Sequence, residues 1–283
     1  MRSFFKCATI VFIMIFVLPV FAQDVTEDLG PVKINWTSKE MIFTGDGAPD
    51  LNAPNAASAR LGAERAAYAD ALRKALEALK GIKVSAGMTL GEKMSSVPAI
   101  KTEVEGYLRG FKAVDKRYFN DGGVQIDLKI PLDGVFIHAV FKDKVKAEVK
   151  TEQKKPEEKP VKKEEQAAKK PEKEKATGLI IVAQGLKIIP VLAPKIIDEK
   201  GIDVYDVTMV SNAGLENGIA SYSSAKEKAE ADKRVANKPL VIKAISSPNS
   251  VDLVISNADA KKVREMAKTN PFLTEGRVII VKN

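Results

Sequence analysis

Polar and apolar residues alternate in two segments of the N-terminal half, the pattern of strands that are buried on one face. The first segment covers 32–36 and resumes over 42–44, and the second covers 124–130. The Asn-Asp-Gly-Gly stretch over 120–123 tolerates positive φ angles, so we expect a β-hairpin whose first arm covers 111–119. The alternating apolar residues are Val32, Ile34, Trp36, Val124, Ile126, Leu128 and Ile130.

An alanine-rich segment over 55–80 has the three- and four-residue spacing of a long helix. Asn52 or Asn55 is suited to cap its start, and Gly81 is suited to follow its end. The residues expected on its buried face are Leu61, Arg65, Tyr68, Leu72, Leu76 and Leu79.

Shorter elements complete the N-terminal half. The glycine-rich stretch 45–49 predicts a loop, 82–90 predicts a strand, and the apolar spacing over 97–108 predicts a second, shorter helix. The order of these elements indicates an α+β fold, in which the long helix packs on one face of a small, largely antiparallel sheet.

The C-terminal half also has the pattern of an α+β domain. Its strands are expected over 179–182, 195–205 (a hairpin that turns at 199–201), 240–245, 251–255 and 278–281. The strands at 240–245 and 251–255 are expected to be joined around Ser247–Ser250. Its helices are expected over 223–234 and over 257–268, the latter capped by Asn257 and burying Val263, Met266 and Ala267.

A tract of lysine, glutamate and proline over 142–176 separates the two halves. Such a composition buries too little apolar surface to offset the entropy of ordering, so we expect a disordered linker. The predicted organisation is a signal peptide over 1–22, an α+β domain over 25–141, the linker, and a second α+β domain over 177–283.

The first 22 residues have the composition of a secretory leader. Arg2 and Lys6 precede an apolar run that Pro19 interrupts, and small or apolar residues follow up to Ala22. We expect cleavage between Ala22 and Gln23, with export to the periplasm or envelope. An uncleaved membrane anchor is the alternative, although the run is short for a bilayer. No later span of the sequence is apolar enough to cross a membrane.

The formal net charge is +8, but basic residues are mixed with acids and few aromatics, so the charge does not indicate a nucleic-acid partner. Cleavage of the leader removes Cys7, the only cysteine, and leaves one histidine, His138. The mature chain therefore has no disulfide and no cluster of soft metal ligands, and we expect no cofactor.

The stretches that flank and form the predicted long helix resemble a known family. They are Gly45–Pro49, Ala59–Arg60, Ala63–Ala67, Asp70–Arg73 and Leu79–Val84. Over 30–135 the chain resembles the Lpp-20-like bacterial envelope lipoprotein domain, which is similar to the N-terminal part of flagellar assembly protein T. The second half resembles the C-terminal part of longer, uncharacterised members, through Pro194–Ile196, Tyr205 and Ile255–Asp259.

The resemblance implies an envelope protein and carries over no catalytic residue. In flagellar relatives the domain belongs to a ring around the rod of the motor. This chain lacks the cysteine that lipoproteins carry at the mature start, so an acyl anchor is not expected.

Serine and carboxylate chemistry have weak support. The serines at 95–96 and 221–224 lack a glycine-flanked elbow, and a triad would depend on His138 as its base. A glycosidase needs only two carboxylates, but Glu64 and Asp70 are six positions apart on the predicted helix and face different ways. Asp46 and Asp50 share the predicted loop, without the spacing of an EF-hand calcium site.

The expected function is therefore that of a non-catalytic binding or scaffold module of the cell envelope, with envelope proteins or cell-wall polymer as partners. Trp36 either packs in the core or offers a stacking surface for carbohydrate. Together with Arg60, Arg73 and Lys74 it is the candidate partner surface. The alternatives are a carboxylate-dependent cell-wall glycan hydrolase and a carrier of lipid or another small ligand. The oligomeric state and the packing of the two domains are open.

Overall fold

The computed structural model describes residues 23–28, 32–132, 134–141, 143 and 176–282. The predicted signal peptide, including Ala22, lies outside the described residues, as does nearly all of the predicted linker. Gln23 is the first described residue and is exposed. Cleavage between Ala22 and Gln23 therefore stays a prediction.

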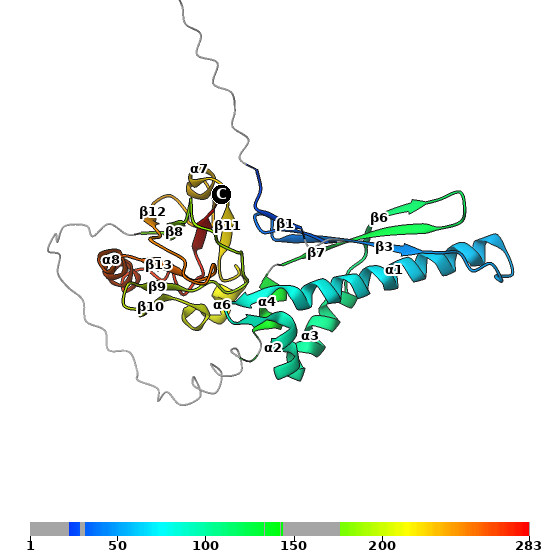
Figure 1. The fold of residues 1–283 in the computed structure, drawn as a ribbon, viewed down its shortest axis with the longest axis horizontal. Helices are drawn as coiled ribbons and strands as arrows, with labels where there is room; N and C mark the ends of the chain where they lie inside the picture. The colour runs from blue at the N-terminus through cyan, green and yellow to red at the C-terminus, as the bar shows by residue number, and fades with distance from the viewer. Residues whose placement is uncertain (1–22, 29–31, 133, 142, 144–175, 283) are drawn as a thin grey trace, which may run out of the picture.

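The N-terminal domain contains a five-stranded antiparallel sheet in the order β1-β2-β3-β7-β6 (Figure 1). The two longest strands, β3 and β7, pair along their whole length, from Glu40 opposite Pro131 to Gly47 opposite Val124. The predicted α+β class and the predicted β6–β7 hairpin are confirmed. The strands are β1 (Thr26–Asp28), β2 (Val32–Asn35), β3 (Glu40–Gly47), β6 (Ala113–Tyr118) and β7 (Val124–Pro131).

The long helix α1 (Ala56–Gly81) packs on β3 and β7, and Asn55 caps it by accepting the Ser58 N–H at 2.9 Å. The predicted buried face was wrong for the first half of this helix, where Leu61 is 55% exposed. The helix instead buries what we call the alanine face: Ala63, Ala67, Ala71, Ala75 and Leu79.

Gly45 and Gly47 explain why the small residues face the sheet. A Cβ atom on Gly45 would lie 2.1 Å from the carbonyl oxygen of Ala67, and one on Gly47 would lie 2.0 Å from that of Ala63. The backbones of α1 and β3 approach so closely that only the smallest side chains fit between them. The loop predicted over 45–49 is therefore corrected, because its first residues belong to the strand and form this contact.

Four short elements and one medium helix close the domain. The segment predicted as one strand over 82–90 is a hairpin, and Leu90 already begins a helix with a Thr89–Glu92 capping box. The predicted second helix is confirmed, with Ile100, Val104 and Leu108 buried. These elements are β4 (Lys83–Ser85), β5 (Met88–Thr89), α2 (Leu90–Ser96), α3 (Pro98–Arg109) and α4 (Gly134–Val140).

The C-terminal domain has two sheets. One is fully parallel, in the order β11-β14-β8-β12, and the other has the order β10-β9-β13. The strands are β8 (Gly178–Val182), β9 (Ile196–Asp198), β10 (Asp203–Tyr205), β11 (Ser221–Ser223), β12 (Pro239–Lys243), β13 (Leu253–Ile255) and β14 (Val278–Val281). The helices are η1 (Val207–Met209), α6 (Asn212–Leu215), α7 (Lys226–Glu230) and α8 (Asn257–Ala267).

Several expectations for this domain hold, while the helix expected over 223–234 and the cap expected at Asn257 are corrected. The hairpin that turns at 199–201 is confirmed, with Gly201 at a φ of 78°. The helix expected over 223–234 is only α7, because its first residue belongs to the buried strand β11. The strands at 240–245 and 251–255 enter different sheets. The cap of α8 is Ser256, whose Oγ accepts the Asp259 N–H at 3.0 Å.

The two domains contact each other directly, and one hydrophobic core extends through both. The rings of Trp36 and Tyr222 meet edge to face with centroids 5.7 Å apart. The backbone N–H groups of Leu192 and Ala193 donate to the carbonyl oxygens of Lys83 and Val84 at 3.1 and 2.9 Å. Backbone hydrogen bonds and an aromatic pair therefore join the domains, independently of the linker.

Candidate functional site

One part of the N-terminal domain extends away from the C-terminal domain (Figure 1). It consists of α1, the end of β3 over 44–47, and the β6–β7 hairpin over 113–131, and we call this unit the arm. Because it projects from the rest of the described chain, a partner can reach it from several sides.

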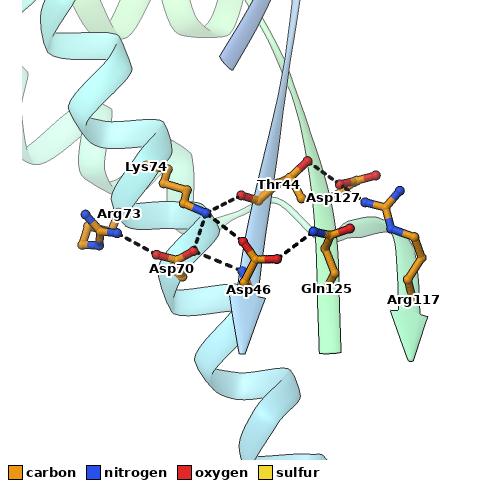
Figure 2. Close-up of polar contacts among 8 residues, drawn as sticks. All are labelled: Thr44, Asp46, Asp70, Arg73, Lys74, Arg117, Gln125 and Asp127. Atoms are coloured by element: carbon orange, nitrogen blue, oxygen red, sulfur yellow. Dashed lines mark hydrogen bonds and ion pairs between the residues drawn. The ribbon is translucent and has the colours of Figure 1, made fainter. Parts of the chain in front are cut away.

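The arm begins where β3 loses its neighbour on one side. The last pair between β2 and β3 is Val32 opposite Phe43, so the outer edge of β3 has no described strand beside it from Thr44 onward. Two side chains of α1 take the place of a strand. Asp70 accepts the N–H of Asp46 at 3.1 Å, and Lys74 donates to the carbonyl oxygen of Thr44 at 3.0 Å (Figure 2).

The same two side chains form an ion-pair cluster. Lys74 Nζ lies 2.7 Å from Asp70 and 3.1 Å from Asp46, and Arg73 pairs with Asp70 at 2.7 Å and with Glu77 at 3.0 Å. Burial acts to raise the pKa of Asp70, but hydrogen bonds from Lys74, the Asp46 backbone and Arg73 outweigh it and lower that pKa to about 2. The hydrogen bond to Asp70 raises the pKa of Lys74.

The network continues across the face of the sheet that α1 does not cover. The amide of Gln125 donates to Asp46 at 2.7 Å, and this bond is the main cause that lowers the pKa of Asp46. Thr44 and Arg117 both donate to Asp127 at 2.7 Å (Figure 2). Polar contacts thus connect α1, β3, β7 and β6 and stiffen the arm.

The chemistry of this cluster differs from that of a glycosidase pair. A glycosidase acid must carry a proton at working pH, which requires a raised pKa. Asp46 and Asp70 both have a lowered pKa, and cations and donors occupy their oxygens. The arrangement instead attaches helix α1 to the edge of strand β3.

A groove of 640 Å³ lies between α1 and β6. Its charged lining carries four cations and one acid, and the acid is already engaged, since Glu64 binds Lys116 at 2.9 Å and Tyr118 at 2.8 Å. Arg65, Arg109 and Lys112 have no acidic partner within the described part of the chain. The lining residues are Glu64, Arg65, Tyr68, Arg109, Gly110, Phe111, Lys112, Ala113, Lys116 and Ile126.

Part of the face of α1 that was expected to be buried lines the groove instead. Arg65 and Tyr68 line it, and the exposed Leu61 lies one turn before Arg65 on α1. Tyr68 also anchors the corner after α3, because its hydroxyl donates to the carbonyl oxygen of Phe111 at 2.7 Å. An amphipathic surface with an excess of positive charge results.

The four residues of the predicted partner surface lie in different places. Trp36 is 5% exposed and lies in the contact between the domains, where its Nε1 donates to Glu27 at 2.9 Å; this corrects the expectation that it is available to a partner or to carbohydrate. Arg60 lies over the ring of Tyr118, 5.5 Å from its centroid, on the arm. Arg73 and Lys74 belong to the cluster at the edge of β3.

Residues that sequence analysis did not single out form most of the groove. Arg109 ends α3 and Lys112 directly precedes β6, and their only signal is that basic residues lie at and just after the end of an amphipathic helix. The contact of Asp70 and Lys74 with the edge of β3 was also missed, because Asp46 was expected in a loop and not in a strand.

The other residues considered for catalysis or metal binding do not lie together. Asp50 follows the strand that holds Asp46, and no group of three or more metal-binding side chains occurs in the described chain. Ser95 and Ser96 donate to the carbonyl oxygens of Gly91 and Glu92 within α2. His138 lines a depression of 450 Å³ between α3 and α4.

Within the described residues, no helix has the length and hydrophobicity that a bilayer crossing requires.

Comparison with known proteins gives a match for the second half of the chain. None of the curated proteins matches this chain. The C-terminal domain is similar to a family described as Treponema pallidum Tp0624, second domain, whose model matches residues 178–283.

Proposed function

We propose that this protein is an exported, non-catalytic binding module of the bacterial cell envelope that presents its arm to another envelope protein. The observation that carries the proposal is the groove between α1 and β6, where Arg65, Arg109 and Lys112 surround an apolar floor without acidic partners among the described residues. Unneutralised cations beside exposed apolar surface are typical of a recognition site.

The stiffness of the arm supports this function. The alanine face is in close contact with β3, and the polar network across the other face joins α1 to all three strands of the arm. A surface that is ordered before binding loses less conformational entropy when a partner docks. The ion-pair cluster around Asp70 and Lys74 thus supports binding without contacting the partner itself.

The contact between the domains supports a scaffold rather than two tethered modules. Lys39 Nζ donates to the carbonyl oxygen of Asn217 at 2.9 Å, and the guanidinium of Arg234 donates to the same oxygen and to that of Gly218. The loop at 217–218 therefore binds one cation from each domain. The arm is held in a fixed orientation relative to the C-terminal domain, as a spacer between two envelope components requires.

The cell envelope is proposed from the leader and from the resemblance of 30–135 to the Lpp-20-like domain. The flagellar relatives of that domain make a motor-associated assembly one specific version of the proposal. Cleavage after Ala22 would release the chain into the periplasm without an acyl anchor.

Two measurements test the proposal. The mass of the protein from a periplasmic fraction is expected to equal that of a chain that begins at Gln23. Recovery of the full-length chain from cytosol would overturn the assignment to the envelope. A photo-crosslinking amino acid is then placed in living cells at Leu61 on the arm or at Ile202 in the C-terminal domain, two residues of similar exposure (55% and 56%).

We expect a discrete adduct with an envelope protein from Leu61 that is absent from Ile202. Equal labelling from both positions, or adducts with cytosolic proteins, would contradict a partner site on the arm. Turnover of cell-wall glycan by the purified protein would contradict the non-catalytic assignment.

A further inference from the structure

The outer edge of β6 is free to accept another strand. Strand β6 ends the sheet, and no described strand pairs with its other side. Phe119 directs its backbone toward the β7 side, since its N–H donates to Gly123 at 2.9 Å and its carbonyl accepts from Gly122 at 3.1 Å. Backbone groups alternate in direction along a strand, so those of Lys116 and Tyr118 face outward.

The surroundings of this edge set the charge of a matching strand. Arg65, Arg109 and Lys112 lie on the same side of the sheet as α1, and the one acid among them, Glu64, is engaged by Lys116 and Tyr118. Val114 on β6 is 60% exposed and adds apolar surface. A complementary strand directs acidic side chains toward the groove cations, and its apolar side chains, at the alternate positions, point to the opposite face of the sheet.

We propose that β6 binds an extended, acidic segment of the partner protein as a sixth strand of the sheet, with its carboxylates facing the cations of the groove. This inference rests on the proposed function and names the chemistry of the partner. Strand β6 has six residues, so the bound segment is expected to be about six residues long, or about 20 Å.

Two other occupants fit the edge less well. A second copy of the arm would leave Arg65, Arg109 and Lys112 opposite cations or solvent. An anionic membrane surface neutralises the cations but has no alternating N–H and C=O groups to pair with the backbone of Lys116 and Tyr118. The main-chain contact therefore distinguishes a peptide strand from a purely electrostatic ligand.

The probe is a fluorescent synthetic peptide of alternating valine and glutamate, added to the purified mature chain at low salt. Fluorescence anisotropy gives its Kd. The controls are the same peptide with a central proline, a peptide of alternating valine and lysine, and vesicles that contain phosphatidylglycerol. We expect binding of the valine–glutamate peptide and at least about tenfold weaker binding of both control peptides.

Two pairs of variants locate the site. Lys116→Pro and Lys116→Ala both remove the lysine charge, but only proline removes the outward N–H, and an edge strand tolerates proline there. We expect Lys116→Pro to bind the peptide about tenfold more weakly than Lys116→Ala. The double variant Arg109→Glu with Lys112→Glu should abolish binding. Lys200→Glu with Lys261→Glu, which makes the same charge change on exposed lysines of the C-terminal domain, should not.

Thermal unfolding of each variant excludes loss of the fold as the cause. Equal affinities of the two Lys116 variants, or vesicle binding without peptide binding, would overturn strand addition. If the valine–glutamate peptide does not bind while Leu61 still crosslinks to an envelope protein, only this inference fails. If Leu61 gives no such adduct in cells, the proposed function itself fails.

Discussion

Asp70 and Lys74, four residues apart on α1, hydrogen-bond two backbone groups that lie two residues apart on β3. Asp70 accepts the Asp46 N–H at 3.1 Å, and Lys74 donates to the Thr44 carbonyl at 3.0 Å. Four helical residues rise about 6.0 Å and two strand residues extend about 6.8 Å, so the two spacings nearly match. A pair of oppositely charged side chains on one helix thus binds backbone groups of β3 that no described strand pairs with.

Removal of either side chain should loosen the arm. Asp70→Ala and Lys74→Ala are each expected to lower the free energy of unfolding by about 1–2 kcal/mol, because each leaves a backbone group of β3 without its partner. Arg73→Ala is the control, since Arg73 is exposed and touches only side chains. Urea unfolding followed by the fluorescence of Trp36, the only tryptophan, measures the change. A loss for Arg73→Ala as large as the other two would contradict this account.

Acid should weaken the same contact. The pKa of Asp70 is about 2 in the folded chain, below its ordinary value of 3.8. A lowered carboxyl pKa contributes stability that is complete above the unfolded value, so the contribution is full above about pH 4 and disappears as the pH falls toward about 2. We expect a loss of about 1–2 kcal/mol over that range, and a shallower loss in Asp70→Asn. Urea midpoints taken at several pH values test this; identical pH profiles for the two proteins would refute it.

Gly45 should tolerate no side chain. A Cβ there would lie 2.1 Å from the carbonyl oxygen of Ala67 and 2.4 Å from the amide nitrogen of Ala71. Gly45→Ala is therefore expected to cost about 3 kcal/mol or more, because α1 must move off the sheet. A Cβ on Gly62 of α1 would meet nothing within 4 Å, so Gly62→Ala should stabilise the chain by about 0.5–1 kcal/mol. Circular dichroism during thermal unfolding compares the two, and similar stabilities would contradict the close approach.

The domains should unfold as one unit. A Cβ on Gly134 would lie 2.3 Å from the carbonyl oxygen of Glu216 across their contact. Gly134→Leu is expected to separate the domains and to split a single calorimetric transition into two. Gly106→Leu on α3, where a Cβ meets nothing within 4 Å, should keep one transition. Two transitions in the unmodified chain would show that the contact does not couple the domains.

Local patterns predicted the elements whose buried face is set by their own residues. The alternation from Val124 to Ile130 gave β7, and the spacing of Ile100, Val104 and Leu108 gave α3, because large apolar residues occupy the buried positions of both. For α1 the same reasoning gave the right span but the wrong face. Gly45 and Gly47, on another element, select the alanine face through close backbone contact.

The rest depended on long-range pairing. Strand β11 has only three residues and too little pattern to detect, and β12 and β13 are neighbours in sequence that enter different sheets. At the candidate site, the Asp70–Lys74 pair was visible as an i,i+4 spacing. Its role was not, because it depends on where β2 stops pairing with β3. The groove likewise depends on the corner at Gly110, which brings Arg109 and Lys112 beside α1.

The alanine face has a consequence for how this protein can change over evolution. Helix α1 has 26 residues, which gives a rod about 39 Å long. It is attached to its sheet by the alanine face and, at the edge of β3, by Asp70 and Lys74, so neither Leu61 nor Arg65 is needed for that attachment. Leu61 and Arg65 can therefore drift freely, and a lineage can exchange one binding specificity for another without rebuilding the fold.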